Sequence, residues 1–444
     1  MPAGAVTESA ASVPPLAIRQ DQPGAVVTVW LAAALFLLIF GCSLWLRMPG
    51  VMINGGEITY DRGLFLCINC ATLTGFQQSI GFNDFNLDSA QGPAIVLILT
   101  IAGSLFAMMA GGLAGVRALR MPFNDRQVIA AALVAEVLAI AVGAAAMGGN
   151  YAFDLVHQSA CAFGNSGAVL LSAKGHHYFP SYRSWSVQGV MLPLSVMGGL
   201  GLPVLMDLYF RAIRVTKKLS LHTRTVIKLT AAIYLASTAV LFLSQLLHHE
   251  AAIVGATASQ SEPAPNTIDP GVGVGSTFVA ASTAALNART LGMPFEYLHR
   301  FPKSAYWFIL LLMIIGASPA GAGGGLKTTT LWKLFTGFSD VLAKRPVNRA
   351  FGVAGAWVGL YFLIAGICFP LLSVLQPQIP TDRLIFLTFS ALSNVGLTQD
   401  THDPISMVGP GLYLLGVIAL LGRLTPIAIL WWLAKTRDAD ILVG

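Results

Sequence analysis

The chain has 444 residues, of which 55% are hydrophobic and only 10% are charged, and its mean hydropathy is +0.71. A water-soluble fold of this length needs far more surface charge, so the composition excludes that class and indicates a polytopic membrane protein. The formal net charge of +6 comes from short links between apolar stretches and calls for no nucleic acid as a partner. Membrane lipid is therefore the first expected partner.

Eight apolar stretches are long enough to cross a hydrocarbon core of about 30 Å. The first 25 residues lack helical periodicity, so 1–25 is expected to be a disordered cytosolic arm. The predicted spans are 26–47, 93–116, 128–149, 187–213, 225–247, 304–335, 350–375 and 409–434, of which 304–335 is interrupted. Four shorter segments cannot span and have the length of pore helices; they lie near 61–73, 152–164, 274–284 and 382–393.

Charge sets the predicted orientation of these spans. The links 116–127, 211–228 and 336–349 are rich in Lys and Arg, so the positive-inside rule places them, and both termini, in the cytoplasm. The opposite links hold most of the acidic residues, with Arg289 among the exceptions. The stretch 251–275 is rich in Ala, Ser, Pro and Gly and is expected to form an external loop.

A polar bend follows each of the four short segments. The bends lie at 71–76, 162–168, 281–287 and 391–397, and a period of roughly 100 residues suits a membrane hairpin with a re-entrant loop. The predicted fold class is an all-α polytopic membrane protein, with four helix–pore-helix–helix repeats around a central pore. The repeats are expected at 26–116, 128–213, 225–335 and 350–435, followed by a cytosolic tail at 436–444.

Four bends that converge on one axis can replace the hydration shell of an ion. Backbone carbonyls supply oxygen ligands, glycine lets the backbone turn them inward, and the C-terminal ends of the short helices favour cations. We therefore predict a cation-conducting pore with a short filter formed by Thr74, Gly75, Asn165, Ser166, Gly167, Ala284, Ala285, Asn394, Val395 and Gly396. The alternative is a helix-rich transporter whose polar turns merely connect spans.

The sixth span is interrupted by a run of glycines. An irregular backbone at membrane depth is tolerated only when it is buried in protein or lines a wet cavity. We predict an intramembrane gate below the filter, with an electrostatic barrier from the last span; its residues are Gly321, Ala322, Gly323, Gly324, Gly325, Lys327 and Arg423. The carbonyl groups of 320–325 are the expected partners of the arginine. The alternatives are a glycine-packed helix contact and an arginine that snorkels to the inner surface.

Three motifs carry a resemblance to a known family. They are the glycine-rich run 316–330, the stretch 198–203 followed by 219–223, and the run 421–426 in the last span. On these motifs, and over about 26–435, the chain resembles the Trk/Ktr/HKT superfamily of potassium transporters, especially the Ktr-type membrane subunit. The resemblance implies four repeats around one pore in a bacterial inner membrane, K⁺ as the transported ion, a homodimer, and a cytosolic nucleotide-binding regulatory ring.

By the same resemblance, three filter glycines fall on Gly75, Gly167 and Gly396. The third bend departs from the family, since Ala285 stands where a glycine is expected and Leu286 replaces an aromatic residue. An alanine in left-handed geometry costs roughly 1–2 kcal/mol, so the strain could weaken discrimination between K⁺ and Na⁺. A Na⁺-conducting or weakly K⁺/Na⁺-selective protein is therefore the alternative function.

Nothing else in the sequence indicates catalysis. It holds no HExxH, GxSxG or phosphate-binding loop, so we expect no enzyme, no cofactor and no metal beyond K⁺ at the filter. Cys67 and Cys70 have CxxC spacing without a second pair, which favours core packing over a metal site. The run 248–250 is interpreted as a solvated helix end. Glu136 lies inside a span, where packing against a basic inner link is favoured over proton coupling.

Overall fold

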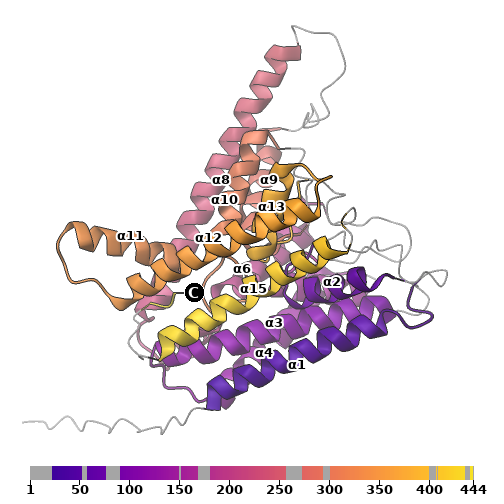
Figure 1. Ribbon diagram of the computed structural model, residues 1–444. Helices are drawn as coiled ribbons and strands as arrows, with labels where there is room; N and C mark the ends of the chain where they lie inside the picture. The colour runs from indigo at the N-terminus through magenta and orange to yellow at the C-terminus, as the bar shows by residue number, and fades with distance from the viewer. Residues whose placement is uncertain are drawn as a thin grey trace, which may run out of the picture.

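Helices make up most of the described part of the chain (Figure 1). The computed structural model describes residues 23–52, 58–76, 91–149, 152–168, 181–256, 273–293, 301–399, 407, 409–435 and 441–443. Apart from isolated bridges, such as that between Ile315 and Leu326, no extended backbone pairs within these residues. The predicted all-α class is therefore confirmed for the part of the chain that is described.

Long and short helices alternate along much of the chain. The long helices are α1 (Pro23–Trp45), α3 (Gln91–Ala118), α4 (Asp125–Met147), α8 (Leu221–Ala256), α12 (Arg349–Leu375) and α15 (Pro410–Ala434). The short helices before the expected bends are α2 (Tyr60–Ala71), α5 (Ala152–Gly164), α9 (Val274–Leu286) and α13 (Thr381–Leu392). The other helices are α6 (Leu192–Leu200), α7 (Leu202–Ala212), α10 (Lys303–Ile314) and α11 (Thr328–Leu342), with two π-helical pieces, η3 (Ser186–Met191) and η4 (Asn287–Leu291).

Six of the described helices are long and apolar enough to cross a membrane, namely α1, α3, α4, α8, α12 and α15. They coincide with six of the eight predicted spans. The predicted span 304–335 is interrupted after α10, as expected, whereas 187–213 is bent by 103° between α6 and α7 and is not one continuous helix. Gly201 makes this bend, with a φ of +90° that glycine adopts at little steric cost.

The short helices are packed between longer ones. Figure 1 shows α1, α3, α4 and α15 lying side by side, and α8 with α9 and α10 beside it. Helix α2 contacts α1, α3 and α15; α5 contacts α3, α4 and α6; α13 contacts α10, α12 and α15. The C-terminal half of α2 is buried throughout, and the ends of α5 and α13 are buried as well. This packing brings the ends of the short helices into the interior of the protein.

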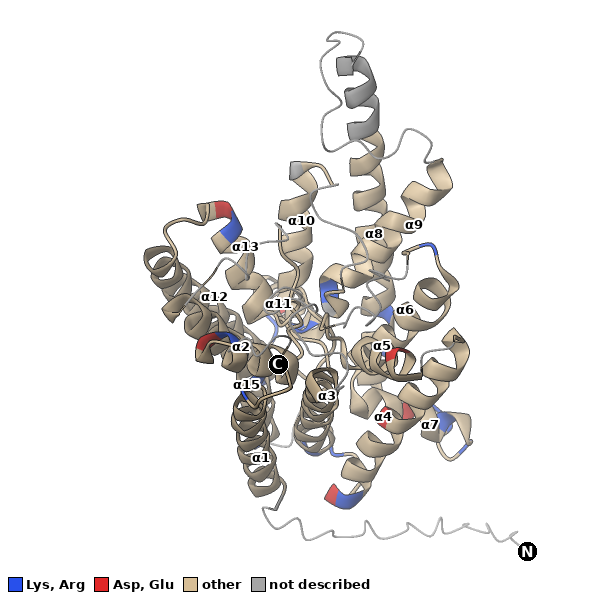
Figure 2. Cartoon of the chain, turned by 90° about the vertical axis from the view of Figure 1, so that its right-hand side faces the viewer, with Lys and Arg blue, Asp and Glu red and all other residues tan. Residues whose placement is uncertain are grey.

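The outer faces of the long helices are apolar. On α1, the side chains of Val29, Trp30 and Leu37 are exposed, and α4 and α12 show similar large apolar side chains on their surfaces. Figure 2 shows the long helices almost free of charge, with Lys, Arg, Asp and Glu concentrated near helix ends. Exposed apolar faces between charged ends are the surface expected of a multi-pass membrane protein.

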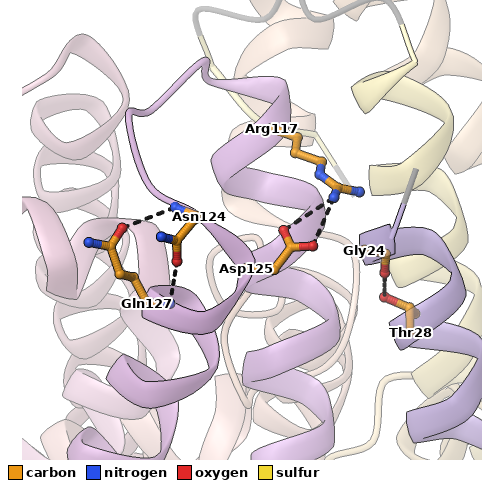
Figure 3. A network of polar contacts seen from close by, with 6 residues as sticks. All are labelled: Gly24, Thr28, Arg117, Asn124, Asp125 and Gln127. Atoms are coloured by element: carbon orange, nitrogen blue, oxygen red, sulfur yellow. Dashed lines mark hydrogen bonds and ion pairs between the residues drawn. The ribbon is translucent and has the colours of Figure 1, made fainter. Parts of the chain in front are cut away.

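Arg117, at the end of α3, joins four long helices at one end of the bundle. Its Nη2 donates to both carboxylate oxygens of Asp125 at the start of α4, at 3.0 and 3.1 Å (Figure 3). Its guanidinium lies 5.1 Å from the ring centroid of Trp431 on α15, and it packs against Gly24 at the start of α1. This half-buried group therefore ties α1, α3, α4 and α15 together.

Side-chain caps fix the start of α4. Asn124 accepts a hydrogen bond from the backbone N–H of Gln127, and the Gln127 side chain accepts one from the backbone of Asn124 (Figure 3). This reciprocal capping box satisfies two of the N–H groups that a helix start leaves free. The α3–α4 connection is therefore a defined turn whose two ends are held by Asn124 and Arg117.

Candidate ion pathway

Three of the four short helices end in the same backbone bend. In each bend, a backbone N–H donates to the carbonyl oxygen five residues earlier: Thr74 to Asn69 (3.0 Å), Ser166 to Cys161 (2.9 Å) and Val395 to Ser390 (3.0 Å). The residue just before each donor is left-handed, namely Leu73 (φ +60°), Asn165 (φ +53°) and Asn394 (φ +49°). Gly75 and Gly396 follow with φ of +75° and +81°. These bends lie where the sequence predicted them.

Hydrogen bonds from side chains in and just after α2 fix the conformation of the first bend. The Asn69 Nδ2 donates to the carbonyl oxygen of Phe76 at 2.8 Å, and its Oδ1 accepts from the Phe76 backbone N–H at 2.8 Å. The hydroxyls of Thr72 and Thr74 lie 2.7 Å apart in a hydrogen bond. All four residues are buried, so these bonds hold the backbone with little competition from water.

The third bend does not lie where the sequence predicted it. Ala284 and Ala285 are helical, because α9 runs through Leu286 and continues as η4 to Leu291. The backbone turns only at Gly292, which has a φ of +62°. The prediction that the chain bends at Ala284 and Ala285 is therefore wrong: alanine is the strongest helix former, and this alanine-rich stretch extends the helix.

Gly292 is the structural counterpart of Gly75. The Asn287 Nδ2 donates to the carbonyl oxygen of Met293 at 2.5 Å, and its Oδ1 accepts from the Met293 backbone N–H at 2.7 Å. This is the clamp that Asn69 makes to Phe76, and the clamped residue again follows a glycine directly. An asparagine that precedes a glycine and a large apolar residue was the signal in the sequence that could have located this bend.

The four glycines approach one another closely at one place. A Cβ atom built on Gly75 would collide with the backbone of Gly167. One built on Gly167 would lie 2.7 Å from the carbonyl oxygen of Gly75 and would collide with that of Gly292. Only glycine leaves room for such backbone contacts, so the first, second and third bends are in direct contact here.

The fourth bend closes the ring. A Cβ on Gly292 would collide with the carbonyl oxygen of Val395 and lie 3.6 Å from that of Thr74. A Cβ on Gly396 would collide with the carbonyl oxygen of Thr74 and lie 2.6 Å from the carbonyl carbon of Gly75. The contacts thus run in order from the first bend to the fourth and back to the first, and a backbone carbonyl group takes part in each of them.

Side chains predicted for the filter hold the bends in place. The Asn394 Nδ2 donates to the Thr74 hydroxyl at 3.0 Å and to the carbonyl oxygen of Ala419 on α15 at 2.8 Å. The Asn165 Nδ2 donates to the carbonyl oxygen of Ser195 on α6 at 3.1 Å. These side chains therefore link bend to bend and bend to helix. Of the predicted filter residues, those brought to the ring are Thr74, Gly75, Asn165, Ser166, Gly167, Asn394, Val395 and Gly396.

The segment 315–327, here called the gate segment, is an irregular loop with paired ends. The Gly316 N–H donates to the carbonyl oxygen of Leu326 at 2.9 Å, and the Ala317 N–H donates to that of Gly324 at 3.3 Å. The segment is buried almost throughout although it is not helical. Several of its backbone groups are hydrogen-bonded within the protein, which is how a non-helical segment at membrane depth is tolerated.

The tip of the gate segment rests on the break between α6 and α7. The Ala322 N–H donates to the carbonyl oxygen of Gly198 at 3.0 Å, and the Leu202 N–H donates to that of Ala320 at 3.0 Å. On the other side, a Cβ on Gly324 would collide with the carbonyl oxygen of Ser393 in the fourth bend. The segment thus contacts the ring of bends directly.

Two buried cations hold the gate segment. The Arg423 Nε donates to the carbonyl oxygen of Thr72 at 2.8 Å, and its Nη1 donates to that of Ala322 at 2.6 Å. The Lys327 Nζ donates to the carbonyl oxygens of Gly323 and Gly324. The predicted contact between Arg423 and the carbonyl groups of 320–325 is therefore present. Both cations donate to carbonyl groups and contact the same segment, while the Arg423 Nη2 has no hydrogen-bond partner among the described residues.

Little free space remains beside these cations. A cavity of about 20 Å³ is bounded by α3, the gate segment and α15, with Lys327 and Arg423 in its wall. A volume of this size holds about one water molecule. The gate segment, Lys327 and Arg423 thus enclose a space of about one water molecule beside α3 and α15.

The remaining candidate groups are packed into the protein. Among the described residues, no group of three or more His, Cys, Asp or Glu could hold a metal ion, and Cys67 and Cys70 are buried free thiols. The Ser104 hydroxyl donates to Glu136 Oε2 at 2.7 Å. Glu136 therefore bonds to α3, whereas the sequence predicted packing against a basic inner link. The side chains of 248–250 lie outside the described residues.

The chain is similar in sequence to curated potassium uptake proteins. It is 25% identical over 297 residues to Ktr system potassium uptake protein B of Vibrio alginolyticus, across 65% of this chain and 60% of that protein. It is 27% identical over 267 residues to the protein of the same name from Bacillus subtilis, across 58% of this chain and 55% of that protein. The matches thus span less than two thirds of either relative's length.

A third relative matches over more of its length. The potassium/sodium uptake protein NtpJ of Enterococcus hirae is 24% identical over 421 residues, across 85% of this chain and 87% of that protein. These relatives are uptake proteins and not enzymes, in agreement with the expectation from the sequence. No protein-family model matches the chain.

The fold has a counterpart among solved structures. The crystal structure of the potassium transporter TrkH from Vibrio parahaemolyticus matches with a TM-score of 0.68, over 95% of this chain and 86% of that chain. At 15% sequence identity, this likeness is one of fold alone. Taken with the sequence relatives, it confirms the resemblance drawn from the motifs: the chain is similar to the membrane subunit of a Trk/Ktr-type potassium transporter.

Proposed function

We propose that the chain conducts K⁺ into the cell through a pore formed by four helix–pore-helix–helix repeats. The observation that carries this proposal is the closed ring of contacts among Gly75, Gly167, Gly292 and Gly396. Carbonyl oxygens at such a ring can replace the water around an alkali cation. The C-terminal ends of α2, α5 and α13 point their partly negative dipoles at the same place, which favours cations over anions.

The gate segment is proposed to obstruct this pore and to open it by moving. It lies against the fourth bend at Gly324 and is tied to the first bend through Arg423. The positive charges of Arg423 and Lys327 repel a cation that leaves the ring, so they add an electrostatic barrier to the steric one. Withdrawal of the segment would remove both barriers together.

A weakly selective or Na⁺-conducting pore is the second candidate. Ala285 at the third filter position no longer supports this candidate, because Ala285 is helical and Gly292 occupies the bend. The candidate now depends on the relative NtpJ, which is named a potassium/sodium uptake protein. A glycine in all four bends favours K⁺ as the main ion.

We also propose an orientation and partners for the chain. Basic links between the spans support cytoplasmic termini in a bacterial inner membrane. The resemblance to Ktr-type subunits supports a homodimer and a cytosolic nucleotide-binding regulatory ring. Co-purification from native membranes tests the ring: recovery of a soluble nucleotide-binding protein with the chain would support it. Full activity of the isolated dimer at physiological nucleotide levels would count against it.

Isotope flux into proteoliposomes tests the ion. In liposomes that contain a high concentration of unlabelled K⁺, the purified chain should accumulate labelled K⁺ from outside. Accumulation of labelled Na⁺ under matched conditions should be clearly lower. Comparable K⁺ and Na⁺ uptake would favour the second candidate. Uptake equal to that of empty liposomes for both ions, with correctly folded protein, would refute transport by this chain.

A matched pair of glycine variants ties the flux to the ring. Gly396 and Gly409 both have positive φ, +81° and +56°, so alanine strains either backbone. Only at Gly396 would the added Cβ collide with another bend, since at Gly409 it meets open space. Gly396→Ala should therefore abolish selective uptake, whereas Gly409→Ala should retain it.

A further inference from the structure

Three of the four bends are backed by a glycine in the helix that follows them. A Cβ built on the glycine would collide with a carbonyl oxygen at the end of the short helix: Gly103 with Ala71, Gly198 with Phe163, and Gly422 with Leu392. In each case this carbonyl group lies two residues after the one that accepts the hydrogen bond of the bend. These three bends are therefore packed backbone to backbone on α3, α6 and α15.

In the third bend the equivalent position is Arg289, two residues after Asn287. Its Nη2 donates to the carbonyl oxygen of Gly316, at a distance of 3.2 Å. Gly316 follows α10, which is the helix after this bend. A charged side chain thus joins the third bend to the segment behind it, at the position where the other bends have a direct glycine contact.

The partner of Arg289 is the base of the gate segment. The Gly316 N–H is bound to Leu326, and the neighbouring Ala317 N–H is bound to Gly324, so Gly316 is part of the paired ends of the segment. Arg289 itself lies only three residues before Gly292, the bend residue of the ring. A displacement of the paired ends therefore acts directly on the residue that precedes the third bend.

The buried guanidinium of Arg289 leaves one nitrogen unpaired. It is 3% exposed, and its Nε has no hydrogen-bond partner in the described part of the chain. A cavity of about 20 Å³ beside it is lined by the polar side chains of Ser195, Thr230 and Ser318, and it contains no acidic residue. One water molecule fits there and can satisfy the guanidinium. The group is therefore not fixed by an ion pair.

The first bend is also connected to the gate segment by an arginine. Arg423 joins the first bend, through Thr72, to the tip of the gate segment at Ala322. The first and third bends are not neighbours in the ring, where Gly75 and Gly292 alternate with the glycines of the other two bends. The gate segment is thus tied at its base to one bend and at its tip to the bend across the ring.

We propose that Arg289 is a positioning residue that couples the gate segment to the filter, so that ion discrimination depends on the position of the gate. With the gate segment in the observed place, the bond to Gly316 holds the third bend in its contacts with the neighbouring bends. When the segment moves, the bond is released and Gly292 is free to shift. This inference rests on the proposed function of K⁺ conduction.

A double-mutant cycle tests the coupling. Arg289→Met removes the hydrogen bond and the charge, and deletion of 320–324 removes the tip of the gate segment. In the intact chain, Arg289→Met should change the K⁺/Na⁺ uptake ratio by about fivefold or more. In the deletion background, the same substitution should leave the ratio unchanged, because the gate segment can no longer influence the filter through Arg289. Thr230→Val, in the same cavity, should leave the ratio of the intact chain unchanged.

Melting, the K⁺/Na⁺ ratio in both backgrounds and total cation uptake together decide the outcome. Melting of the purified protein separates a structural role from coupling, since a structural role lowers stability without a gate-dependent change in ratio. If Arg289→Met does not fold, Arg289→Gln replaces it, as it is too short to reach Gly316 yet stays polar. An unchanged ratio, or an equal change in both backgrounds, overturns the inference. Absence of cation uptake by the unmodified chain would instead refute the proposed function itself.

Discussion

Gly292 is the residue whose substitution tests the corrected filter most sharply. Its φ of +62° is left-handed, and an alanine there is strained by roughly 1–2 kcal/mol. The added Cβ would also collide with the carbonyl oxygen of Val395 in the next bend. The strain alone corresponds to a shift of about 5- to 30-fold between two conformations, and the collision adds to it. We therefore expect Gly292→Ala to lower K⁺ uptake by about tenfold or more.

Ala285→Gly is the matched control for this substitution. Ala285 is buried within α9, where a glycine weakens the helix by about 1 kcal/mol relative to alanine. Its melting temperature should fall slightly, while uptake per folded molecule and the K⁺/Na⁺ ratio should match those of the unmodified chain. Both variants are assayed by isotope flux in proteoliposomes, normalised to folded protein. Normal selective uptake by Gly292→Ala, or an altered ratio in Ala285→Gly, would refute the assignment of the third bend.

Three further substitutions probe the gate, a clamp and the helix bundle. Arg423→Ala removes the tether to Ala322 and a positive charge, so K⁺ flux should rise several-fold; unchanged flux in the same liposome assay would contradict the barrier. Asn287→Leu leaves the buried backbone groups of Met293 unpaired, at about 1–3 kcal/mol for each group. It should lower both the melting temperature and K⁺ uptake, and loss of neither would contradict the clamp. Arg117→Met removes a half-buried ion pair and a cation–π contact worth about 1 kcal/mol each, so the melting temperature should fall by a few degrees with selectivity intact. A changed ion ratio in Arg117→Met would show that this end of the bundle acts on the filter.

The apolar spans and the broken sixth span were predictable because their signals are local. A long apolar run needs no knowledge of its neighbours, and the glycines of 320–325 break a helix wherever they occur. The contact between Arg423 and Ala322 was also predictable, since a buried arginine without a nearby carboxylate requires carbonyl groups. Three of the four bends were located because a polar residue and a glycine directly follow their short helices.

The third bend was missed because tertiary structure shifts it along the chain. The stretch around Ala285 has the small and polar residues of the other bends, but its alanines keep it helical and η4 adds a further turn. The bend is delayed until Gly292, which the expected spacing did not include. The clamp from Asn287 to Met293 matches the one from Asn69 to Phe76 in the first bend, and an asparagine before a glycine and a large apolar residue is its signal in the sequence.

Arg289 and Gly201 were missed for a related reason. In the sequence, Arg289 was an exception to the charge asymmetry of the links, whereas the structure buries it against Gly316. The span 187–213 was expected to be continuous, although its run of Gly198, Gly199, Gly201 and Pro203 is of the kind that breaks a helix, and the structure bends it by 103° at Gly201. The gate segment contacts this bend, where the Leu202 N–H donates to the carbonyl oxygen of Ala320. The partners of Arg289 and Leu202 both lie on the gate segment, which is distant in sequence from both of them.

The most direct measurement is an ion-occupancy map of the purified chain with K⁺ replaced by Rb⁺, read from the anomalous signal of rubidium. The account predicts a peak at the centre of the ring formed by Gly75, Gly167, Gly292 and Gly396, with backbone carbonyl oxygens as its nearest protein atoms, and a weaker peak or none there when Na⁺ is the sole cation. A rubidium peak at the level of Ala285 on α9, or an empty ring with rubidium bound elsewhere in the protein, would contradict it.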